Sequence, residues 1–559
     1  SLETFGKHIF DELVSRSFFL DIETSKDKLE CYSITTCKIH DLMHDIAMFV
    51  MEKECVVATR KPSKLEWLLD TARHLFLSCE ETEGILNDAL EKKSPAIQTL
   101  ICDSPIRSSL KHLSKYSSLH ALKLCLRTKS FLLKPKYLHH LRYLDLSNSH
   151  IEALPEDISI LYNLQVLDLS NCRYLERLPR QMKYMTSLCH LYTHGCRNLK
   201  SMPPGLENLT KLQTLTVFVA GVPGPDCADV GELHGLNIDG RLELCQVENV
   251  EKAEAEVANL GGQLELQHLN LGDQLELRRV ENVKKAEAKV ANLGNKKDLR
   301  ELTLRWTEVG DSKVLDKFEP HGGLQVLKIY SYGGECMGML QNMVEIHLFH
   351  CEGLQILFRC SAIFTFPKLK VLMLEYLLGF ERWWEIDERQ EEQTIFPVLE
   401  KLFISHCGKL VAFPEAPLLQ EPCSEGGYRL VRSAFPALKV LKMKCLGSFQ
   451  RWDAVEGTLF PELEKLSVQK CPKLVALPKA PKLSVFEIED GKQEIFHCVD
   501  RYLSSLTNLT LKLENIETTS EVECTSIVPV DSKEKWNQKS PLAVMELGCC
   551  NSFFGAGAL

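Results

Sequence analysis

Residues 141–155 have the sequence LRYLDLSNSHIEALP, and residues 164–179 have the similar sequence LQVLDLSNCRYLERLP. In both stretches leucines occupy the first, fourth and sixth positions. The fourth and sixth residues point to one side of a strand, and the residues around them point to the other side. A unit of this kind buries its leucines only when a similar unit stacks against it. The pair therefore predicts a stack of short coils, each containing one strand.

The same pattern recurs with a regular period. Successive copies start at Leu119, Leu141, Leu164, Leu188 and Leu212, which are 22, 23, 24 and 24 residues apart. A period of roughly 20 to 29 residues is typical of leucine-rich repeats. We therefore expect an α/β fold, a leucine-rich-repeat solenoid of horseshoe form, with regular repeats over about residues 97–220.

The second half of the chain keeps the pattern but not the period. Copies start at Leu299, Leu324, Met343, Leu369, Leu399, Leu438, Leu463 and Leu506, with spacings from 19 to 43 residues. This predicts irregular repeats with inserts over about residues 240–559. Two related inserts indicate a larger duplicated unit, in which Phe366 is equivalent to Phe435 and Phe396 is equivalent to Phe460. Trp383 and Trp384 either anchor a partner or fold back over the adjacent coil.

A closer duplication lies between the two halves. LELCQVENVEKAEAEVANLG, from Leu242, returns as LELRRVENVKKAEAKVANLG from Leu275. Apolar residues from Val247 to Leu260 follow helical spacing, with Glu and Lys between them. Each copy predicts a strand followed by an amphipathic helix on the outer side of the solenoid.

Asn or Cys follows many of the predicted strands. Such residues occupy positions 148, 171, 196, 351, 407 and 471. We expect them to turn the chain inward and to satisfy backbone groups between coils. This role explains much of the count of 22 cysteines without disulfides, metal or redox chemistry.

Composition limits the classes of partner. The chain has 559 residues, of which 45% are hydrophobic and 25% charged, and its net charge is -10. With a pI near 6.0, nucleic acid and anionic membranes are unfavourable principal partners. The sequence shows no secretory signal and no apolar run of about 20 residues, so we expect an intracellular protein without a membrane span. Because it begins at Ser1, we expect a piece of a longer product.

The first 60 residues lack the repeat pattern. Ile9, Phe10, Leu13 and Val14 follow helical spacing, and two short strands and a second helix over KIHDLMHDIA (residues 38–47) follow. Helix, hairpin and helix are typical of a winged-helix module. We therefore predict two regions, a winged-helix remnant over residues 1–60 and a repeat domain over residues 70–559.

Two groups of residues invite a metal assignment. His40, Asp41 and His44 spell H-D-x-x-H, but zinc proteases of similar spacing use Glu as the base and require a further ligand. Cys189, His190, His194 and Cys196 lie close in sequence, but the repeat register directs them to different faces. We expect no metal. No nucleophile is paired with a base either, so no catalytic residue and no enzyme activity are predicted.

Several segments resemble one known family. FDELVSRSFF, KIHDLMHDIA, TARHLFL from Thr71 and the ENV blocks around Asn249 and Asn282 are similar to the C-terminal part of plant NB-ARC leucine-rich-repeat disease resistance proteins of the coiled-coil subclass. The resemblance covers nearly the whole chain. It identifies Ile39, His40 and Asp41 with the family's Met-His-Asp motif and implies that His40 and Asp41 sense ADP. No G-x-x-x-x-G-K-[ST] occurs in the chain, so ADP or ATP is expected only in a longer parent protein and no cofactor in this piece.

The repeat register also predicts a binding surface. The third, fifth and seventh positions of each copy should face outward from the leucines. The predicted protein-binding residues are Tyr143, Asp145, Asp168, His190, Tyr192, His194, Phe218, Tyr330, Phe349 and Phe403. Ser147, Val166, Ser170, Thr214, Thr216 and His347 occupy equivalent positions.

The resemblance implies a function for this surface. The repeats would recognise a pathogen effector or a modified host protein, contact the NB-ARC region of the parent, restrain its ADP/ATP switch and lead to a defence response in the cytoplasm or nucleus. The alternative is a substrate adaptor of a ubiquitin ligase. That class needs an F-box-like helical segment, which the predicted hairpin at residues 18–39 matches poorly.

Overall fold

The computed structural model divides into two units, residues 1–276 and 277–559. It describes residues 2–26, 33–51, 53–59, 70–79, 82–92, 96–107, 110, 117–129, 134–221, 224–228, 230–246, 274–278, 299–306, 323–334, 342–360, 366–386, 396–413, 418–422, 428–432, 435–450, 452, 460–474, 476–491, 505–513 and 544–549. Within them, no helix is both long and apolar enough to span a bilayer.

The N-terminal segment has the predicted order of helix, hairpin and helix. Its elements are α1 (Leu2–Ser15), β1 (Phe19–Lys26), β2 (Ser33–Ile39) and α2 (Asp41–Val50). The two strands pair antiparallel, with a register shift between Leu20 and Glu23. The rings of Phe10 and Phe19 stack at 5.3 Å, which ties α1 to the hairpin. The winged-helix prediction is confirmed at this level.

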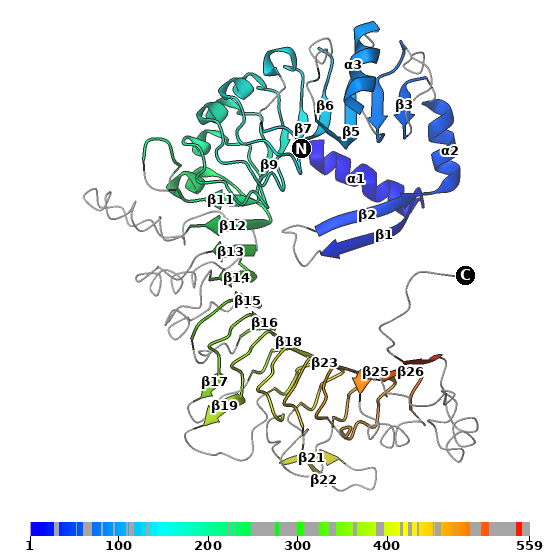
Figure 1. Cartoon of the computed structure of the whole chain (residues 1–559), viewed down its shortest axis with the longest axis vertical. Coiled ribbons are helices and arrows are strands. Elements are labelled where there is room, and N and C mark those ends of the chain that lie inside the picture. The colour runs from blue at the N-terminus through cyan, green and yellow to red at the C-terminus, as the bar shows by residue number, and fades with distance from the viewer. Residues whose placement is uncertain are drawn as a thin grey trace, which may run out of the picture. The chain divides into compact units, whose positions relative to one another are not determined.

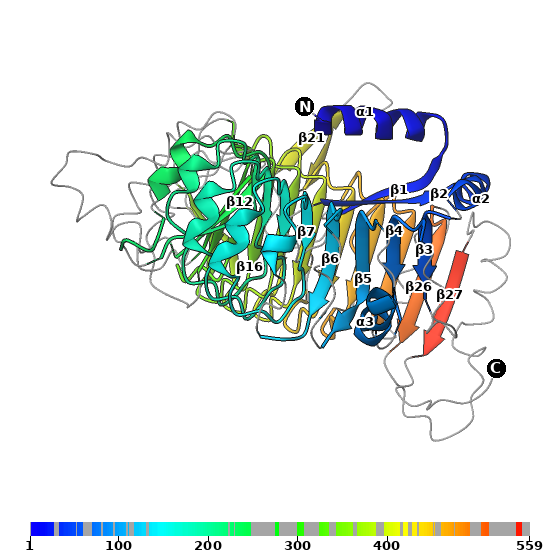
Figure 2. The same cartoon turned by 90° about the horizontal axis from the view of Figure 1, so that it is seen from above.

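Unit 1 then forms one parallel sheet of eight strands in chain order (Figures 1 and 2). The strands are β3 (Cys55–Ala58), β4 (His74–Leu77), β5 (Thr99–Ile106), β6 (Ala121–Leu126), β7 (Tyr143–Asp145), β8 (Val166–Asp168), β9 (His190–Tyr192) and β10 (Thr214–Leu215). The sheet begins at β3, before residue 70, which is the predicted start of the repeats. Unit 1 continues with β11 (Val217–Val219), β12 (Arg241–Cys245) and the start of β13 (Gln274–Arg278).

The leucines of the pattern form the core of unit 1. Leu144, Leu167 and Leu191, at equivalent positions of three strands, are at most 1% exposed. Helices follow the strands, most of them single 3₁₀ turns: α3 (Thr82–Lys92), η3 (Pro135–Tyr137), η4 (Glu156–Ile160), η5 (Arg180–Tyr184), η6 (Leu206–Asn208) and η7 (Val230–Gly235). The buried Ile158 and Met182 close the far side of their coils. The predicted leucine-rich-repeat solenoid is confirmed.

Unit 2 contains a second parallel ladder. Its strands, in sheet order, are β14 (Glu301–Arg305), β15 (Val326–Tyr330), β16 (Glu345–Phe349), β18 (Val371–Glu375), β20 (Lys401–Ser405), β23 (Val440–Lys444), β24 (Lys465–Gln469), β25 (Val485–Gly491), β26 (Asn508–Leu513) and β27 (Val544–Cys549). Two short pairs lie outside this ladder: β17 (Ile356–Cys360) with β19 (Arg382–Ile386), and β21 (Leu418–Pro422) with β22 (Tyr428–Arg432).

The sequence pattern missed two coils of unit 2, those of β25 and of β27, which follows the last predicted copy. The longest predicted gap, from Leu463 to Leu506, holds the coil of β25, whose inward residues are Phe486 and Ile488. Because neither of them is leucine, the coil was mistaken for an insert. The other predicted strands of unit 2 are present.

After two of the strands, the inward residue lies one position later than predicted. Asn148 and Asn171 have φ of 59° and 60°, in the left-handed region that Asn and Gly tolerate best. The inward residue is the next one, Ser149 or Cys172, and both are fully buried. Assigning Asn148 and Asn171 to the same position as Cys196 was therefore wrong.

The inward residues bond to the previous coil as predicted for the cysteines. Cys172 Sγ donates to the carbonyl oxygen of Leu146 at 3.1 Å, and Cys196 Sγ donates to that of Leu169 at 3.0 Å. Burial raises the pKa of Cys196 to about 12, so its thiol stays protonated and can donate. The cysteines at the inward position, Cys172, Cys196, Cys351, Cys407 and Cys471, are free thiols.

A column of phenylalanines runs through unit 2. Phe366, Phe396, Phe435 and Phe460 each precede the first leucine of a coil by three residues, and none is more than 1% exposed. Successive rings stack at 5.4, 5.6 and 6.3 Å. The four are thus equivalent coil by coil, and not only in the two pairs predicted.

The tryptophan alternatives are settled for one residue. Trp383 is 4% exposed, and its Nε1 donates to the carbonyl oxygen of Ala412 at 3.2 Å. It therefore folds back over the adjacent coil. The side chain of Trp384 and the predicted helices after Leu242 and Leu275 lie outside the described residues, whereas the two predicted strands are β12 and β13.

Candidate functional site

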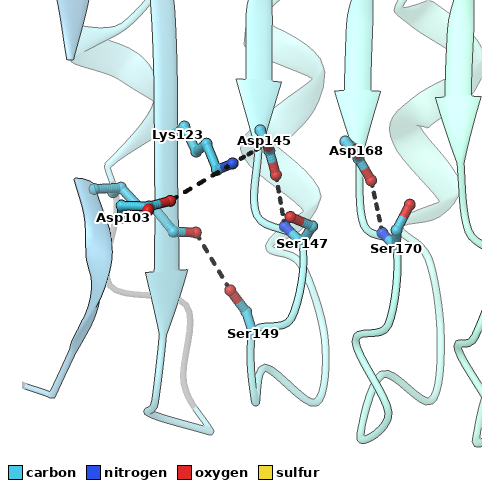
Figure 3. A network of polar contacts seen from close by, with 8 residues as sticks. Asp103, Lys123, Asp145, Ser147, Ser149, Asp168 and Ser170 are labelled. Carbon is cyan, nitrogen blue, oxygen red and sulfur yellow. Dashed lines mark hydrogen bonds and ion pairs between the residues drawn. The ribbon is translucent and has the colours of Figure 1, made fainter. Parts of the chain in front are cut away.

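The candidate site is the face of each ladder that carries the strand residues alternating with the buried leucines. We call it the display face. In unit 1 its middle row runs through Lys123, Asp145, Asp168 and Tyr192, which are register neighbours on β6, β7, β8 and β9. Figure 3 shows the first three of them. Backbone pairing holds neighbouring strands about 4.8 Å apart, so these side chains form a fixed array.

Asp145 is the best-anchored residue of this row. Its Oδ1 accepts a hydrogen bond from the backbone N–H of Ser147 at 2.8 Å, and its Oδ2 lies 3.7 Å from Lys123 Nζ. The same Nζ lies 3.9 Å from Asp103 Oδ1 (Figure 3). Asp145 is only 5% exposed, so it lies on the display face but offers a partner little surface.

Asp168 is more accessible than Asp145. Its Oδ1 accepts from the backbone N–H of Ser170 at 2.8 Å. Burial raises the pKa of Asp168 and the charge of Asp145 adds to the rise, whereas the bonds from Ser170 and the charge of Lys123 oppose it. The carboxyl group is half-buried beside Tyr192 and can accept a donor from a partner.

His194 does not project as predicted. It is 4% exposed, and its Nδ1 lies 2.9 Å from Ser170 Oγ on the neighbouring coil. Burial lowers its pKa to about 4, so the imidazole is neutral near pH 7. His190 and Tyr192 remain half-buried, with rings stacked at 6.2 Å. The display face therefore keeps these two residues and loses His194.

Phe218 is also turned inward, contrary to the prediction. It is fully buried and pairs with Leu244 in the register of β11 and β12. The chain changes register at Thr216, because β10 ends at Leu215 and the next strand pairs with a different neighbour. Thr216 Oγ1 accepts from the backbone N–H of Thr193 at 2.8 Å, which holds this bulge.

In unit 2 the predicted aromatic residues lie on the display face. Tyr330, Phe349, Phe403 and His347 are all half-buried. Tyr330 and Phe349 stack at 4.6 Å, and the guanidinium of Arg305 lies 3.7 Å from the Tyr330 ring centroid. The three side chains make one stack across β14, β15 and β16, and aromatic surface of this kind suits protein recognition.

The sequence reasoning missed a second stack. His350, Tyr376 and His406 each occupy the left-handed turn position, with rings 4.5 and 4.1 Å apart. The repeat pattern predicts outward side chains only at the third, fifth and seventh positions, whereas these residues occupy the eighth. Asp103 and Lys123 were missed too. Lys123 was detectable, because it is the fifth residue of the copy that starts at Leu119.

His40 and Asp41 stand at the start of α2. His40 is the N-cap, and its Nδ1 accepts from the backbone N–H of Leu42 at 3.2 Å. Both His40 and Asp41 are exposed, and His44 Nδ1 faces Asp45 at 3.4 Å. In the part of the chain that the structure describes, no three His, Cys, Asp or Glu side chains are arranged to hold a metal ion.

The apolar side of α2 is uncovered in the described chain. Leu42, Ile46, Phe49 and Val50 are 61%, 46%, 82% and 73% exposed, and no residue of α2 is buried. A single helical stripe this exposed is typical of a surface that packs against another protein segment.

Comparison with known families divides the chain in the same way. Residues 1–47 match the disease resistance protein winged helix domain, residues 97–274 match the leucine-rich repeat region, and residues 264–377 match the R13L1/DRL21 LRRs. The fold and these matches define a leucine-rich-repeat protein with a winged-helix segment at its start.

Several similar proteins of known family are plant disease resistance proteins. A disease resistance protein of Arabidopsis thaliana, At3g14460, is 30% identical over 85% of this chain and 30% of its own length. Disease resistance protein RGA2 of Solanum bulbocastanum is 28% identical over 85% of this chain and 40% of its own length. The chain is similar, over most of its length, to leucine-rich-repeat disease resistance proteins of plants. It spans less than half the length of these relatives.

Among solved structures, the leucine-rich-repeat protein LIC12759 of Leptospira interrogans is 15% identical to this chain. The structural match covers 83% of this chain and 97% of the LIC12759 chain, with a TM-score of 0.39. The fold assignment rests on the strand register and the matched families, because this likeness is too distant to add to it.

Proposed function

We propose that the chain is the sensing half of an intracellular plant immune receptor that recognises a pathogen effector, or a host protein modified by one, through its display face. The observation that carries this proposal is the register of the strands. It fixes Tyr143, Asp168, His190 and Tyr192 in adjacent rows on a rigid ladder. Repeat ladders provide extended binding surfaces, and aromatic residues contribute much of the energy of protein interfaces.

The N-terminal segment would connect recognition to a switch. In a parent protein with a phosphate-binding loop, His40 and Asp41 would contact bound ADP, and the apolar side of α2 would pack against the nucleotide-binding region. Support comes from the exposed position of His40 as N-cap of α2 and from the exposure of Phe49 and Val50. The repeats would restrain the ADP/ATP exchange of the parent until a partner binds. The compartment that fits this role is the cytoplasm or the nucleus.

The recognition proposal is tested in the full-length parent receptor, expressed in leaf tissue that mounts a defence response to the pathogen. Tyr143→Ala with Tyr192→Ala changes the display face. The control is Tyr162→Ala with Tyr184→Ala, because these residues are 55% and 59% exposed but lie in or beside the 3₁₀ helices, away from the strands. The first pair should abolish the response at equal protein level, and the control should keep it. A normal response from both pairs would overturn the proposal.

The switch proposal needs a separate pair of variants. In the same parent, His40→Ala should trigger the response without any pathogen, whereas His44→Ala, on the same exposed helix, should not. Equal resting behaviour of the two variants would contradict a role for His40 in restraint.

A further inference from the structure

Three exposed lysines gather on the display face of unit 2. We call this group the lysine patch, formed by Lys401 on β20 and Lys442 and Lys444 on β23. All three side chains are exposed. None of them forms an ion pair with a carboxylate among the residues that the structure describes. Paired strands carry them, since Lys401 is in register with Val440 and Ser405 with Lys444.

Lysines on either side of the patch are compensated. On β15, Lys328 Nζ lies 2.6 Å from Glu301 Oε1, and on β24, Lys465 Nζ lies 2.6 Å from Glu487 Oε1. The display face therefore pairs its lysines with carboxylates at close distance before and after β20 and β23, but not on them. Two acidic residues lie near the patch: Glu375 on the neighbouring β18, opposite Ser405, and Glu487 on β25, which interacts electrostatically with Lys442.

An apolar strip runs into the patch. Met373, Phe403 and Lys442 are register neighbours on β18, β20 and β23. Met373 and Phe403 are half-buried, and Lys442 Nζ lies 5.4 Å from the centroid of the Phe403 ring. The ring stays open enough to contact a partner while its neighbours supply charge.

We propose that the lysine patch, with Phe403 and Met373, binds an acidic segment of a partner protein that carries an apolar residue beside its carboxylates. Charge complementarity selects the partner, because the chain as a whole carries a net charge of -10 and disfavours acidic proteins elsewhere on its surface. This inference rests on the proposed recognition role of the display face and names the chemistry of what is recognised.

An acidic protein segment fits better than a nucleic acid. Nucleic acid is held by longer tracks of Lys and Arg along a phosphate backbone. Here the patch holds only three lysines, with Glu375 beside them and Glu345 and Glu487 each two strands away on the same face. The apolar strip would also have no use in a contact made only to phosphates.

The test measures binding of the full chain to defined probes by fluorescence anisotropy. The probe is a fluorescein-labelled peptide of twelve residues built from Glu-Glu-Phe repeats, and a second peptide has Gln in place of Glu. A twelve-nucleotide polyuridine represents nucleic acid. The patch variant is Lys401→Glu, Lys442→Glu and Lys444→Glu. The control is Lys409→Glu, Lys473→Glu and Lys482→Glu, which makes the same charge change outside the strands.

We expect the acidic peptide to bind the natural chain and the control variant with equal affinity. Its affinity for the patch variant should be lower by about tenfold. Binding should weaken as salt rises, and the Gln peptide should not bind. Lys442→Gln alone should give a smaller loss, which keeps the test valid if the triple variant unfolds. Equal affinity of the patch and control variants, or tighter binding of polyuridine that needs the patch, would overturn the proposal.

The two proposals fail in distinguishable ways. If the patch variant loses the peptide but its parent receptor still responds to the pathogen, the binding chemistry stands and its place in immune recognition is wrong. If the peptide never binds while Tyr143→Ala with Tyr192→Ala still abolishes the response, the lysine patch is wrong and the recognition role stands.

Discussion

Ser149 and Cys172 hold equivalent places in successive coils, and each connects its coil to the one before. Ser149 Oγ accepts the backbone N–H of Leu126 at 2.8 Å, and Cys172 Sγ donates to the carbonyl oxygen of Leu146. A buried backbone group without a partner is costly, so the small polar residue at this position matters more than its size indicates.

The first prediction concerns this contact. Ser149→Ala leaves the Leu126 N–H unsatisfied in a fully buried place, which should destabilise the coil by about 1–3 kcal/mol. Ser147→Ala is the control, because Asp145 bonds to the backbone N–H of Ser147 and not to its hydroxyl (Figure 3). Hydrogen exchange over residues 119–150, read by mass spectrometry, should rise only in Ser149→Ala. Equal exchange in the two variants would refute the contact.

The second prediction concerns His194 and acid. The pKa of His194 is about 4 in the folded chain, whereas the ordinary pKa of histidine, 6.5, applies to the unfolded chain. Between these two pH values the unfolded chain therefore binds more protons than the folded chain. Folding of this coil should therefore weaken as pH falls from 7 to 5, by about 2 kcal/mol. His194→Asn, which can still bond to Ser170, should lack this loss. Local exchange over residues 188–196, corrected for intrinsic rates, measures it, and parallel pH profiles of the two proteins would exclude the effect.

At the residue scale the sequence predicted most of the display face but not its exceptions. Tyr143, Asp168, Tyr192, Tyr330 and Phe403 lie where alternation along a strand placed them. His194 and Phe218 do not. Alternation assumes an unbroken strand, and neither the bulge at Thr216 nor the cover that neighbouring coils give His194 has a signature in a single copy of the repeat.

The repeating element of this protein is a single coil. In unit 2, neighbouring coils pack against each other through phenylalanines. The rings of Phe366, Phe396, Phe435 and Phe460 stack in sequence behind the strands. The two inner rings, Phe396 and Phe435, therefore each belong to two contacts of the stack, one on either side. The stack ends where Ala480 takes the same position before Leu483.

The third prediction follows from this stacking. Phe435→Ala should destabilise its region by about 3–5 kcal/mol, because it leaves a cavity between the rings of Phe396 and Phe460. Hydrogen exchange should increase in the coils of β20 and β24 as well as in that of β23. Phe403→Ala, which removes a half-buried ring from the display face, should cost less and stay local. A loss confined to β23 would show that the column does not couple neighbouring coils.

At the element scale, leucine spacing predicted the strands because the pattern and the structure share one cause, the need to bury two residues per strand. It failed for β25, where Phe486 and Ile488 do the same work. The inward position is predicted one residue early at Asn148 and Asn171, because these residues match the Asn of the repeat pattern in type but not in position.

At the scale of the whole molecule, the two units present different chemistry on their display faces. In unit 1 the middle row carries carboxylates around Lys123, with Tyr192 beside them. In unit 2 the stack of Arg305, Tyr330 and Phe349 precedes the lysine patch. The net charge of -10 does not reveal this difference between the two display faces, because it is summed over both units.

The most direct test of recognition by the display face is photo-crosslinking in the full-length parent receptor. A benzoylphenylalanine replaces Tyr192 on the display face or, as the control, the 55% exposed Tyr162 away from the strands. On irradiation of challenged tissue, the account predicts a covalent adduct at Tyr192 that is absent from unchallenged tissue, and none at Tyr162. An adduct at Tyr162 alone, or equal adducts at both positions, would contradict it.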